Sequence, residues 1–414
     1  MRFKFQPLIL TLLLVSIAGC SPPIASYTLN NLYMRKQENE SADFTDEQID
    51  NVAEILTAMF GTPDEPTLPG GVDGLTEVID PSYLSMAAGP VRVDEYQVGV
   101  GLYRRHCVHC HGTSGDGHGP TAPYLNPYPR DYRSGVFKFK STPIGARPTH
   151  EDLKRVLVNG VAGTSMPSFV LSKEVEIESL VYYVKYLSIR GEVERRLYEE
   201  MAQELDEGEL LVPEGEDMQE SIDYLLDEIV GGVVAKWRAA DSQMTPVPQR
   251  PEMTADEMEA SVKRGQELFY GAVANCVKCH GDSQLGDGQM DDYDSWGKDF
   301  VDLTAVTNPE EKQEYIDEIE ALGGLKPRHI IPRNLRSGVY RGGRRPVDLY
   351  WRVHNGIDGG PMPAASLKPE GAGPEAKGLD DSDIWDLVNY VLSLPYEKMH
   401  TQGADEPVYT RARQ

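Results

Sequence analysis

Two short runs of the sequence hold side chains that can act together chemically. Each run has two cysteines separated by two residues and followed at once by a histidine. The thiols of such a run can form thioether bonds with the vinyl groups of a haem, and the adjacent imidazole then lies under the iron. The sequence therefore predicts two covalently bound haems c. The predicted binding residues are Cys107, Cys110 and His111 in the first run, and Cys276, Cys279 and His280 in the second.

A zinc site is the other chemistry that paired cysteines and a histidine can support. The two halves of a structural zinc site usually lie within about 12 to 20 residues of each other. Here the length of a whole small domain separates the two cysteine pairs, and each pair has its own histidine. The spacing favours haem, and zinc or a disulfide pair is the alternative.

A haem iron needs a second axial ligand, which decides between electron transfer and chemistry on a bound small molecule. A Met-Pro pair lies in a loop of small residues ahead of the last apolar helix in each half of the chain, with Met166 in 159–167 and Met362 in 355–363. The thioether is a soft donor that raises the reduction potential. Their equivalent positions favour both methionines as iron ligands over ordinary gap-filling core residues. His354 is the alternative ligand for the second haem.

The elements that must position these residues occur twice in the same order. Ahead of each motif lie a glycine and an aromatic residue one helical turn apart, and a glycine on that face lets another helix approach closely. These pairs are Gly99 with Tyr103 and Gly265 with Phe269. Each half ends in a helix with apolar residues at i, i+3, i+4 and i+7, which gives it one apolar face. The residues are Leu180, Tyr183, Val184 and Leu187, and Leu387, Tyr390, Val391 and Leu394.

This repeated plan resembles that of class I cytochrome c domains, and the chain resembles a dihaem c-type cytochrome made by duplication. The resemblance covers residues 90–190 and 255–400. It implies an all-α fold with two tandem domains, in which a histidine and a methionine hold each iron. In the family a proline carbonyl, at the place of Pro120 here, faces the proximal histidine. A long insertion after His280 leaves the second domain without a matching proline, so how His280 is oriented stays open.

The sequence also suggests how the insertion is exposed and what the basic residues near the motifs contact. Aspartates at 291, 292, 294 and 299 and a charged helical stretch near 310–322 predict a solvated excursion from the second domain. Arginines and lysines cluster after each motif. They can pair with the haem propionates, form a docking face for an acidic partner, or remain solvated. The members are Arg130, Arg133, Lys138, Lys140 and Arg147, and Arg328, Arg333, Arg336, Arg341, Arg344, Arg345 and Arg352.

The amino terminus predicts export. Residues 1–19 have a basic start, a short apolar core and small residues before a cut site, as a signal peptide does. The sequence Ile-Ala-Gly-Cys resembles a bacterial lipobox, in which Cys20 is acylated after cleavage. Acyl chains on Cys20 would hold the protein on the periplasmic side of a bacterial membrane without a spanning helix. The alternative is an uncleaved anchor with an ordinary buried Cys20.

The remaining segments are a tether with a helical leader at 20–89, an acidic connector at 191–254 and a tail at 401–414. Thr45 and Gln48 form a capping-box pattern that predicts a helix start in the leader. The formal charge of −26 is uneven, because Lys plus Arg number 13 against 9 Asp plus Glu in 90–190, but 5 against 20 in 191–260. Such acidity makes nucleic acid an unlikely partner.

We expect an electron carrier rather than an enzyme. The resemblance implies a membrane-attached respiratory cytochrome that relays electrons from a quinol-oxidising complex or a dehydrogenase to a terminal oxidase or reductase. The alternative is a dihaem enzyme, a peroxidase or a sulfur-compound oxidoreductase, in which one haem is open to substrate. Two equivalent Met-Pro loops favour the carrier.

Overall fold

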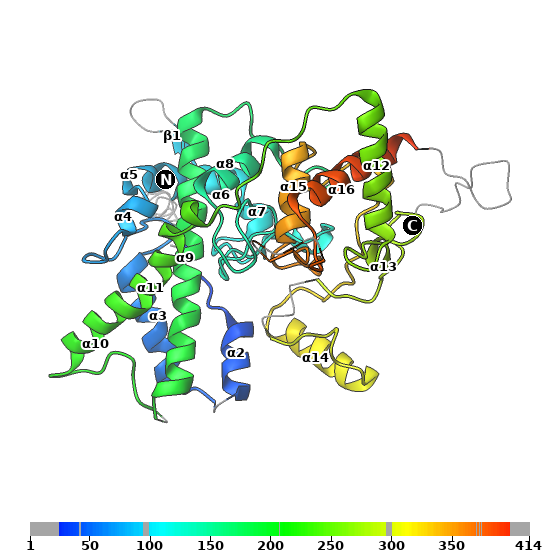
Figure 1. Cartoon of the computed structure of the whole chain (residues 1–414). Helices are drawn as coiled ribbons and strands as arrows, with labels where there is room; N and C mark the ends of the chain where they lie inside the picture. The colour runs from blue at the N-terminus through cyan, green and yellow to red at the C-terminus, as the bar shows by residue number, and fades with distance from the viewer. Residues whose placement is uncertain are drawn as a thin grey trace, which may run out of the picture.

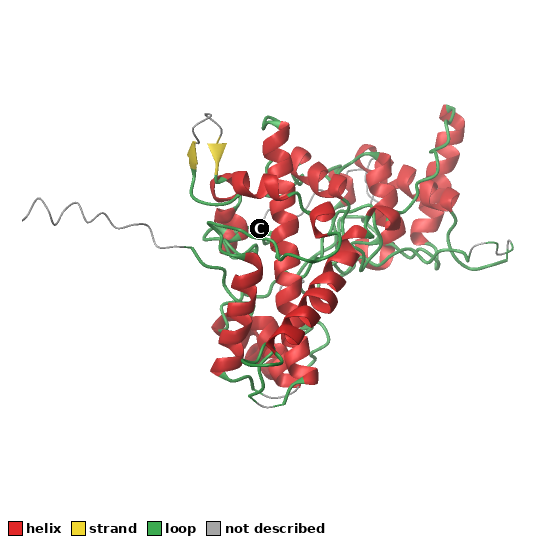
Figure 2. Ribbon diagram, turned by 90° about the vertical axis from the view of Figure 1, so that its left-hand side faces the viewer, coloured by secondary structure: helices red, strands yellow, loops and turns green. Residues whose placement is uncertain are grey.

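The computed structural model describes residues 25–40, 43–93, 99–206, 208–294, 300–369, 371, 373 and 375–397. Cys20, the predicted signal peptide and the tail from 401 lie outside the described residues. The described part is built from helices, with one antiparallel pair of two-residue strands, β1 (Arg92–Val93) and β2 (Gly99–Val100), as Figure 2 shows. The predicted all-α fold is thus confirmed. Among the described residues no helix has the length and apolar character needed to cross a membrane.

The helices follow the predicted order along the chain (Figure 1). The leader contains α2 (Asn31–Glu40), α3 (Asp46–Phe60), α4 (Leu75–Val78) and α5 (Pro81–Ala87). The first haem domain contains α6 (Leu102–His106), α7 (Val108–His111), α8 (His150–Asn159) and α9 (Glu174–Glu204). The connector has α10 (Met218–Tyr224), a π-helical segment (Leu225–Val230) and α11 (Gly231–Arg238). The second domain contains α12 (Ala255–Tyr270), α13 (Val277–His280), α14 (Pro309–Ala321), α15 (Pro346–Asn355) and α16 (Asp381–Ser393).

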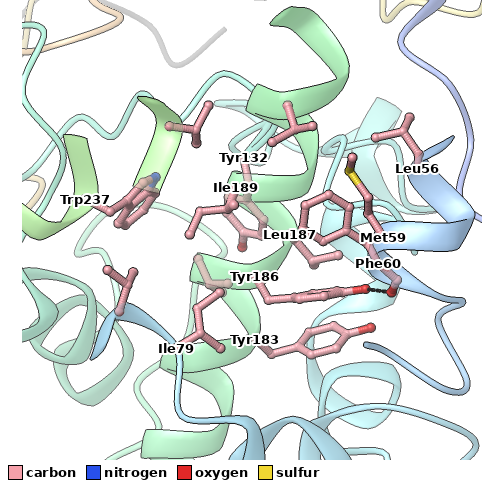
Figure 3. Close-up of a cluster of buried hydrophobic side chains, with 14 of the residues drawn as sticks. Leu56, Met59, Phe60, Ile79, Tyr132, Tyr183, Tyr186, Leu187, Ile189 and Trp237 are labelled. Atoms are coloured by element: carbon pink, nitrogen blue, oxygen red, sulfur yellow. Dashed lines mark hydrogen bonds between the residues drawn. The ribbon is translucent and has the colours of Figure 1, made fainter. Parts of the chain in front are cut away.

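Helix α9 joins the leader, the first haem domain and the connector into one unit. It is 31 residues long and continues across residue 190, where we expected the domain to end. The four apolar residues predicted for its core face are all buried. Figure 3 shows tyrosines of α9 packed between Phe60 of the leader and Trp237 of the connector, and the hydroxyl of Tyr186 donates a hydrogen bond to the carbonyl of Phe60. The three segments therefore share a single hydrophobic core.

The leader helix α3 begins as predicted. The backbone N–H of Gln48 donates to Thr45 Oγ1 at 3.2 Å, and the N–H of Thr45 donates to Gln48 Oε1 at 3.0 Å. This reciprocal pair satisfies two amides that the first turn would leave free. The start of α3 is therefore fixed locally, before its apolar face packs on α9.

The second domain is organised around the crossing of α12 and α16. A Cβ atom added to Gly265 would lie 2.0 Å from the carbonyl oxygen of Asp386, so the two helix backbones are in direct contact there. Ser261 and Arg264, on the same face of α12, both donate to the carboxylate of Asp386. The close approach that the glycine predicted is present in this domain.

The corresponding prediction for the first domain is wrong. Gly99 lies in β2 rather than on a helix, and a Cβ atom there would meet nothing nearer than Nη1 of Arg105 at 3.9 Å. Gly101, with φ +75°, breaks the regular backbone, so α6 begins only at Leu102. Helix α5 of the leader packs on α9, and the short α6 also contacts α9 through Tyr103, whose ring centroid lies 5.0 Å from that of Tyr183.

Substituting the crossing glycine should destabilise the second domain. For Gly265→Ala we expect a loss of about 1–3 kcal/mol or more, because the new methyl group must push the helices apart. Gly232→Ala is the matched control, since nothing lies within 4 Å of its added Cβ and it should gain about 0.5–1 kcal/mol. Denaturant unfolding followed by far-ultraviolet circular dichroism would measure both. An unchanged stability of the Gly265 variant would contradict the tight crossing.

Candidate functional site

Each predicted haem motif forms a one-turn helix. The N–H of His111 donates to the carbonyl of Cys107 at 2.8 Å, and that of His280 donates to the carbonyl of Cys276 at 2.9 Å. One turn places the first cysteine and the histidine of each run on the same side of the backbone. The four motif cysteines are free, so the disulfide alternative is not present in the structure. No group of three or more His, Cys, Asp or Glu side chains suited to a metal ion occurs among the described residues.

The two histidines are oriented by equivalent carbonyl groups. Nδ1 of His111 lies 3.1 Å from the carbonyl oxygen of Arg130, and Nδ1 of His280 lies 3.2 Å from that of Arg333. A donated Nδ1–H fixes the tautomer and leaves the lone pair of Nε2 for a metal. The expectation that the Pro120 carbonyl has this role is therefore wrong. The insertion leaves the second histidine as well held as the first, because Arg130 and Arg333 are equivalent in the two repeats.

Burial keeps both imidazoles neutral. It lowers the pKa of His111 to about 4, against the smaller opposing effect of the Arg130 carbonyl, and it also lowers the pKa of His280. Burial raises the pKa of Cys107 to about 12 and that of Cys276 to about 11. Neutral imidazole is the form that binds iron. In the first domain the ring of Tyr132 stacks on His111 with centroids 4.8 Å apart. No pattern in the sequence predicted this contact.

The two Met-Pro loops have the same backbone design. The N–H of Val161 donates to the carbonyl of Met166 at 3.1 Å, and that of Ile357 donates to the carbonyl of Met362 at 3.0 Å. A further pair of equivalent bonds ties each loop back to the preceding helix, from Phe169 to Leu157 and from Ala365 to Val353. Both methionines are half-buried. The loops are thus equivalent in structure as well as in sequence, and iron ligation by these methionines stays a prediction.

His354 has other contacts. Its Nδ1 lies 2.7 Å from Oδ1 of Asn355, and its ring stacks on Tyr350 of the same helix with centroids 5.8 Å apart. A helical side chain already engaged with its neighbours is a poor replacement for Met362. We therefore keep the methionine as the expected ligand of the second site.

The two haem domains face each other through equivalent residues. A Cβ atom on Gly163, in the Met166 loop, would lie 2.7 Å from Nη2 of Arg333. Reciprocally, a Cβ atom on Gly359, in the Met362 loop, would lie 3.0 Å from Nη1 of Arg130. Such reciprocal pairs are the mark of twofold symmetry. Equivalent helices also meet, because the guanidinium of Arg155 on α8 lies 5.3 Å from the ring centroid of Trp351 on α15.

Comparison with known families supports the repeated architecture. A cytochrome c family model matches residues 262–395, and a model of subunit III of cbb3-type cytochrome c oxidases matches residues 94–184. The chain is a c-type cytochrome with two cytochrome c domains. The matches fall inside the expected ranges 255–400 and 90–190.

None of the curated proteins matches the chain. A chain of the reducing HAO-like protein complex of Kuenenia stuttgartiensis aligns at 23% identity over 71% of this chain and 94% of that chain, with a TM-score of 0.43.

The basic residues of the cytochrome gather at the domain interface. Lys138 and Arg341 occupy equivalent positions in the two repeats, as Arg130 and Arg333 do. The pKa of Lys138 is lowered to about 8, mainly by burial and also by the nearby Arg130 and Arg341, against the opposing effect of Asp294. Burial likewise lowers the pKa of Arg341, with a contribution from Arg333. Asp294, from the insertion, lies 3.6 Å from Nζ of Lys138.

This interface cluster, Arg130, Lys138, Arg333 and Arg341, fits the haem propionates. The buried Nε of Arg341 has no hydrogen-bond partner among the described residues, so it remains available to a carboxylate. Arginine forks pair well with such groups. By contrast, Arg133 and Arg147 of the first domain pair with protein carboxylates, those of Asp131 and Glu192. Arg133 and Arg147 are thus engaged by carboxylates of the protein itself, as Lys138 is by Asp294.

The insertion is a solvated excursion only in part, because Asp291 is exposed while other residues make buried contacts, and Asp299 lies outside the described residues. Asp294 is buried, and the guanidinium of Arg328 donates to the carbonyls of Leu125 and Pro123 at 2.7 and 2.6 Å while it lies over the ring of Tyr128. Helix α14 also contacts the leader. Leu32 of α2 packs with Ile316 and Ile319, and Arg35 Nε lies 3.1 Å from Glu318 Oε1. The aspartate-rich sequence obscured these contacts, because their partners lie in other segments.

Proposed function

We propose that the cytochrome is an electron carrier with two haems c, each held by one histidine and one methionine, and that electrons pass between the two sites inside the molecule. When bound, each haem supplies one reversible one-electron step. The reciprocal contact of each Met-Pro loop with the other domain carries this proposal, because it turns the two sites toward one interface. With both sites at one interface, electrons can pass from one haem to the other without a separate mobile carrier.

The protein residues have separate tasks in this function. The carbonyl groups of Arg130 and Arg333 orient the proximal imidazoles, while burial keeps these rings neutral. The loops around Met166 and Met362 present soft donors and exclude water from the distal sides. The interface cluster balances the propionate charge, so that desolvated carboxylates remain at the interface.

We further propose that an acylated Cys20 attaches the cytochrome to the periplasmic face of a bacterial membrane. Cys20 precedes the first described residue, Ala25, by five positions, which corresponds to at most about 18 Å of extended chain. The N–H of Ala25 donates to Asp64, whose carboxylate pairs with Arg104 on α6, the helix that enters the first motif. The anchor would therefore hold the first haem domain near the bilayer.

For partners we propose a quinol-oxidising complex or a dehydrogenase as donor and a terminal oxidase or reductase as acceptor. The match of the first domain to a family named for an oxidase subunit supports a place in such a chain. The position of Ala25 supports entry of electrons at the first domain when the donor is itself in the membrane.

A potentiometric titration of protein truncated after Cys20 tests the carrier. We expect two one-electron waves at high potential, with the far-red absorption band of methionine-ligated ferric haem accounting for both centres. Cyanide should bind slowly to either haem, because both axial positions are filled. A high-spin or low-potential haem that binds cyanide or peroxide at once would instead favour the dihaem enzyme. Mass spectrometry of the full chain would separately report acylation of Cys20.

A further inference from the structure

The near-symmetry of the two distal loops is broken at two positions. Asn355 and Asp358 precede Met362 and are buried, with 4% and 9% of their surface exposed. Their equivalents before Met166, Asn159 and Ala162, are both exposed. The second loop therefore has contacts with the rest of the protein that the first loop lacks.

Asp358 is bound by the first haem domain. Its Oδ2 accepts from Nζ of Lys140 at 2.9 Å and from the N–H of Gly145 at 3.0 Å. The Lys140 ammonium also donates to the carbonyls of Pro143 and Ala146, so its three N–H groups have three acceptors. The Lys140 side chain is 3% exposed. This is a buried, fully hydrogen-bonded ion pair between domains, the kind whose disruption leaves an uncompensated charge.

Asn355 adds a second attachment at the start of the same turn. Its Nδ2 donates to the carbonyl of Ser141 at 3.1 Å, and its Oδ1 accepts from the hydroxyl of Thr245 at 2.8 Å. The turn then closes through the hydrogen bond from Ile357 to the carbonyl of Met362. Residues 140–145 of the first domain thus hold the backbone from the end of α15 to Asp358, four residues before the methionine.

We propose that Lys140 is a positioning residue for Met362, so that the first haem domain sets the distal ligand of the second haem. The inference rests on the proposed ligation by Met362. The Met166 loop has no matching clamp, because Ala162 has no carboxylate to offer. The position of Met362 would therefore depend on a buried ion pair with the other domain, whereas the position of Met166 would not.

Ferric spectra of the Lys140→Met variant test this role. We expect loss of up to half of the far-red methionine band, at least tenfold faster cyanide binding at one haem, and a fall in potential of one wave only. Lys140→Arg should restore most of the band, because arginine keeps the charge and can still reach Asp358. Asp358→Asn keeps the shape of the loop and should show the same defect in milder form. This variant tests the same ion pair if the Lys140→Met protein folds poorly.

Three matched controls separate this role from general damage. Asn159→Ala should leave both haems unchanged, whereas Asn355→Ala should loosen the second site only. Lys185→Met removes another buried lysine, one that donates to the carbonyl of Val78 in the leader, and should keep the full far-red band. Met362→Ala shows which signal belongs to Met362. If that variant loses half of the band and Lys140→Met loses none, the positioning role is refuted; if it loses none, the proposed ligation itself fails.

Discussion

Replacing both Cys276 and Cys279 with alanine should leave a cytochrome that carries one haem per chain. Each motif supplies its own two thioether bonds, and its histidine is oriented by a carbonyl of its own domain. Haem content, intact mass and potentiometry should each fall from two centres to one. The first domain should retain its haem, because its core includes the leader and the connector rather than the second domain.

The reciprocal variant, with Cys107 and Cys110 replaced, is the control for this experiment. It should also carry one haem. Each single-haem protein should show one of the two waves of the parent, shifted only by the loss of the electrostatic interaction between the two haems. Two haems in either variant, or one in the parent, would contradict the assignment of one haem to each motif. Loss of both haems would show instead that the domains mature as a single unit.

Substituting either methionine should cause the second large effect. In Met166→Ala and in Met362→Ala the affected site loses a soft donor that stabilises reduced iron. Because axial ligands vary haem potentials over roughly 0.8 V, we expect one wave to fall by an amount on the order of 0.1 V or more. The far-red band should drop by about half in each variant and disappear in the double variant. Potentiometry and ferric absorption spectra measure both quantities.

Met290→Ala is a suitable control for the methionine variants, since the Met290 side chain is 45% exposed and lies in the insertion. It should change neither the band nor either wave. A variant of Met166 or Met362 that kept the parent spectrum would place the ligand elsewhere. His354 would then be tested next for the second site, because it lies near the end of α15, eight residues before Met362.

The two haem domains differ in the segments that enclose them. The first domain is enclosed by the leader and the connector, which meet along α9, whereas the second domain has a separate core. The insertion then links the second domain to the leader through Arg35 and Glu318. This arrangement favours a fixed orientation of the two domains, as a relay between two sites requires.

The sequence by itself determined the features that depend on neighbouring residues. The spacing of Cys107, Cys110 and His111 names a haem motif because one helical turn must bring these groups together. The apolar period of α9 and α16, the capping box at Thr45 and the close approach at Gly265 are likewise local patterns, and the structure contains each of them. The Met-Pro loops are recognisable in the sequence because both repeats contain one at the equivalent position.

The tertiary structure alone decided which distant groups meet. The carbonyls that orient the two histidines lie 19 and 53 residues away from them, so the sequence offered no reason to prefer Arg130 and Arg333 over Pro120. The prediction that Gly99 lies on a helix failed because Gly101 has a positive φ, so that α6 begins only at Leu102. The bond between Lys140 and Asp358 joins different domains, and burial rather than residue type gives it strength. A charged side chain looks the same in sequence whether it faces water or a buried partner, and only packing distinguishes the two.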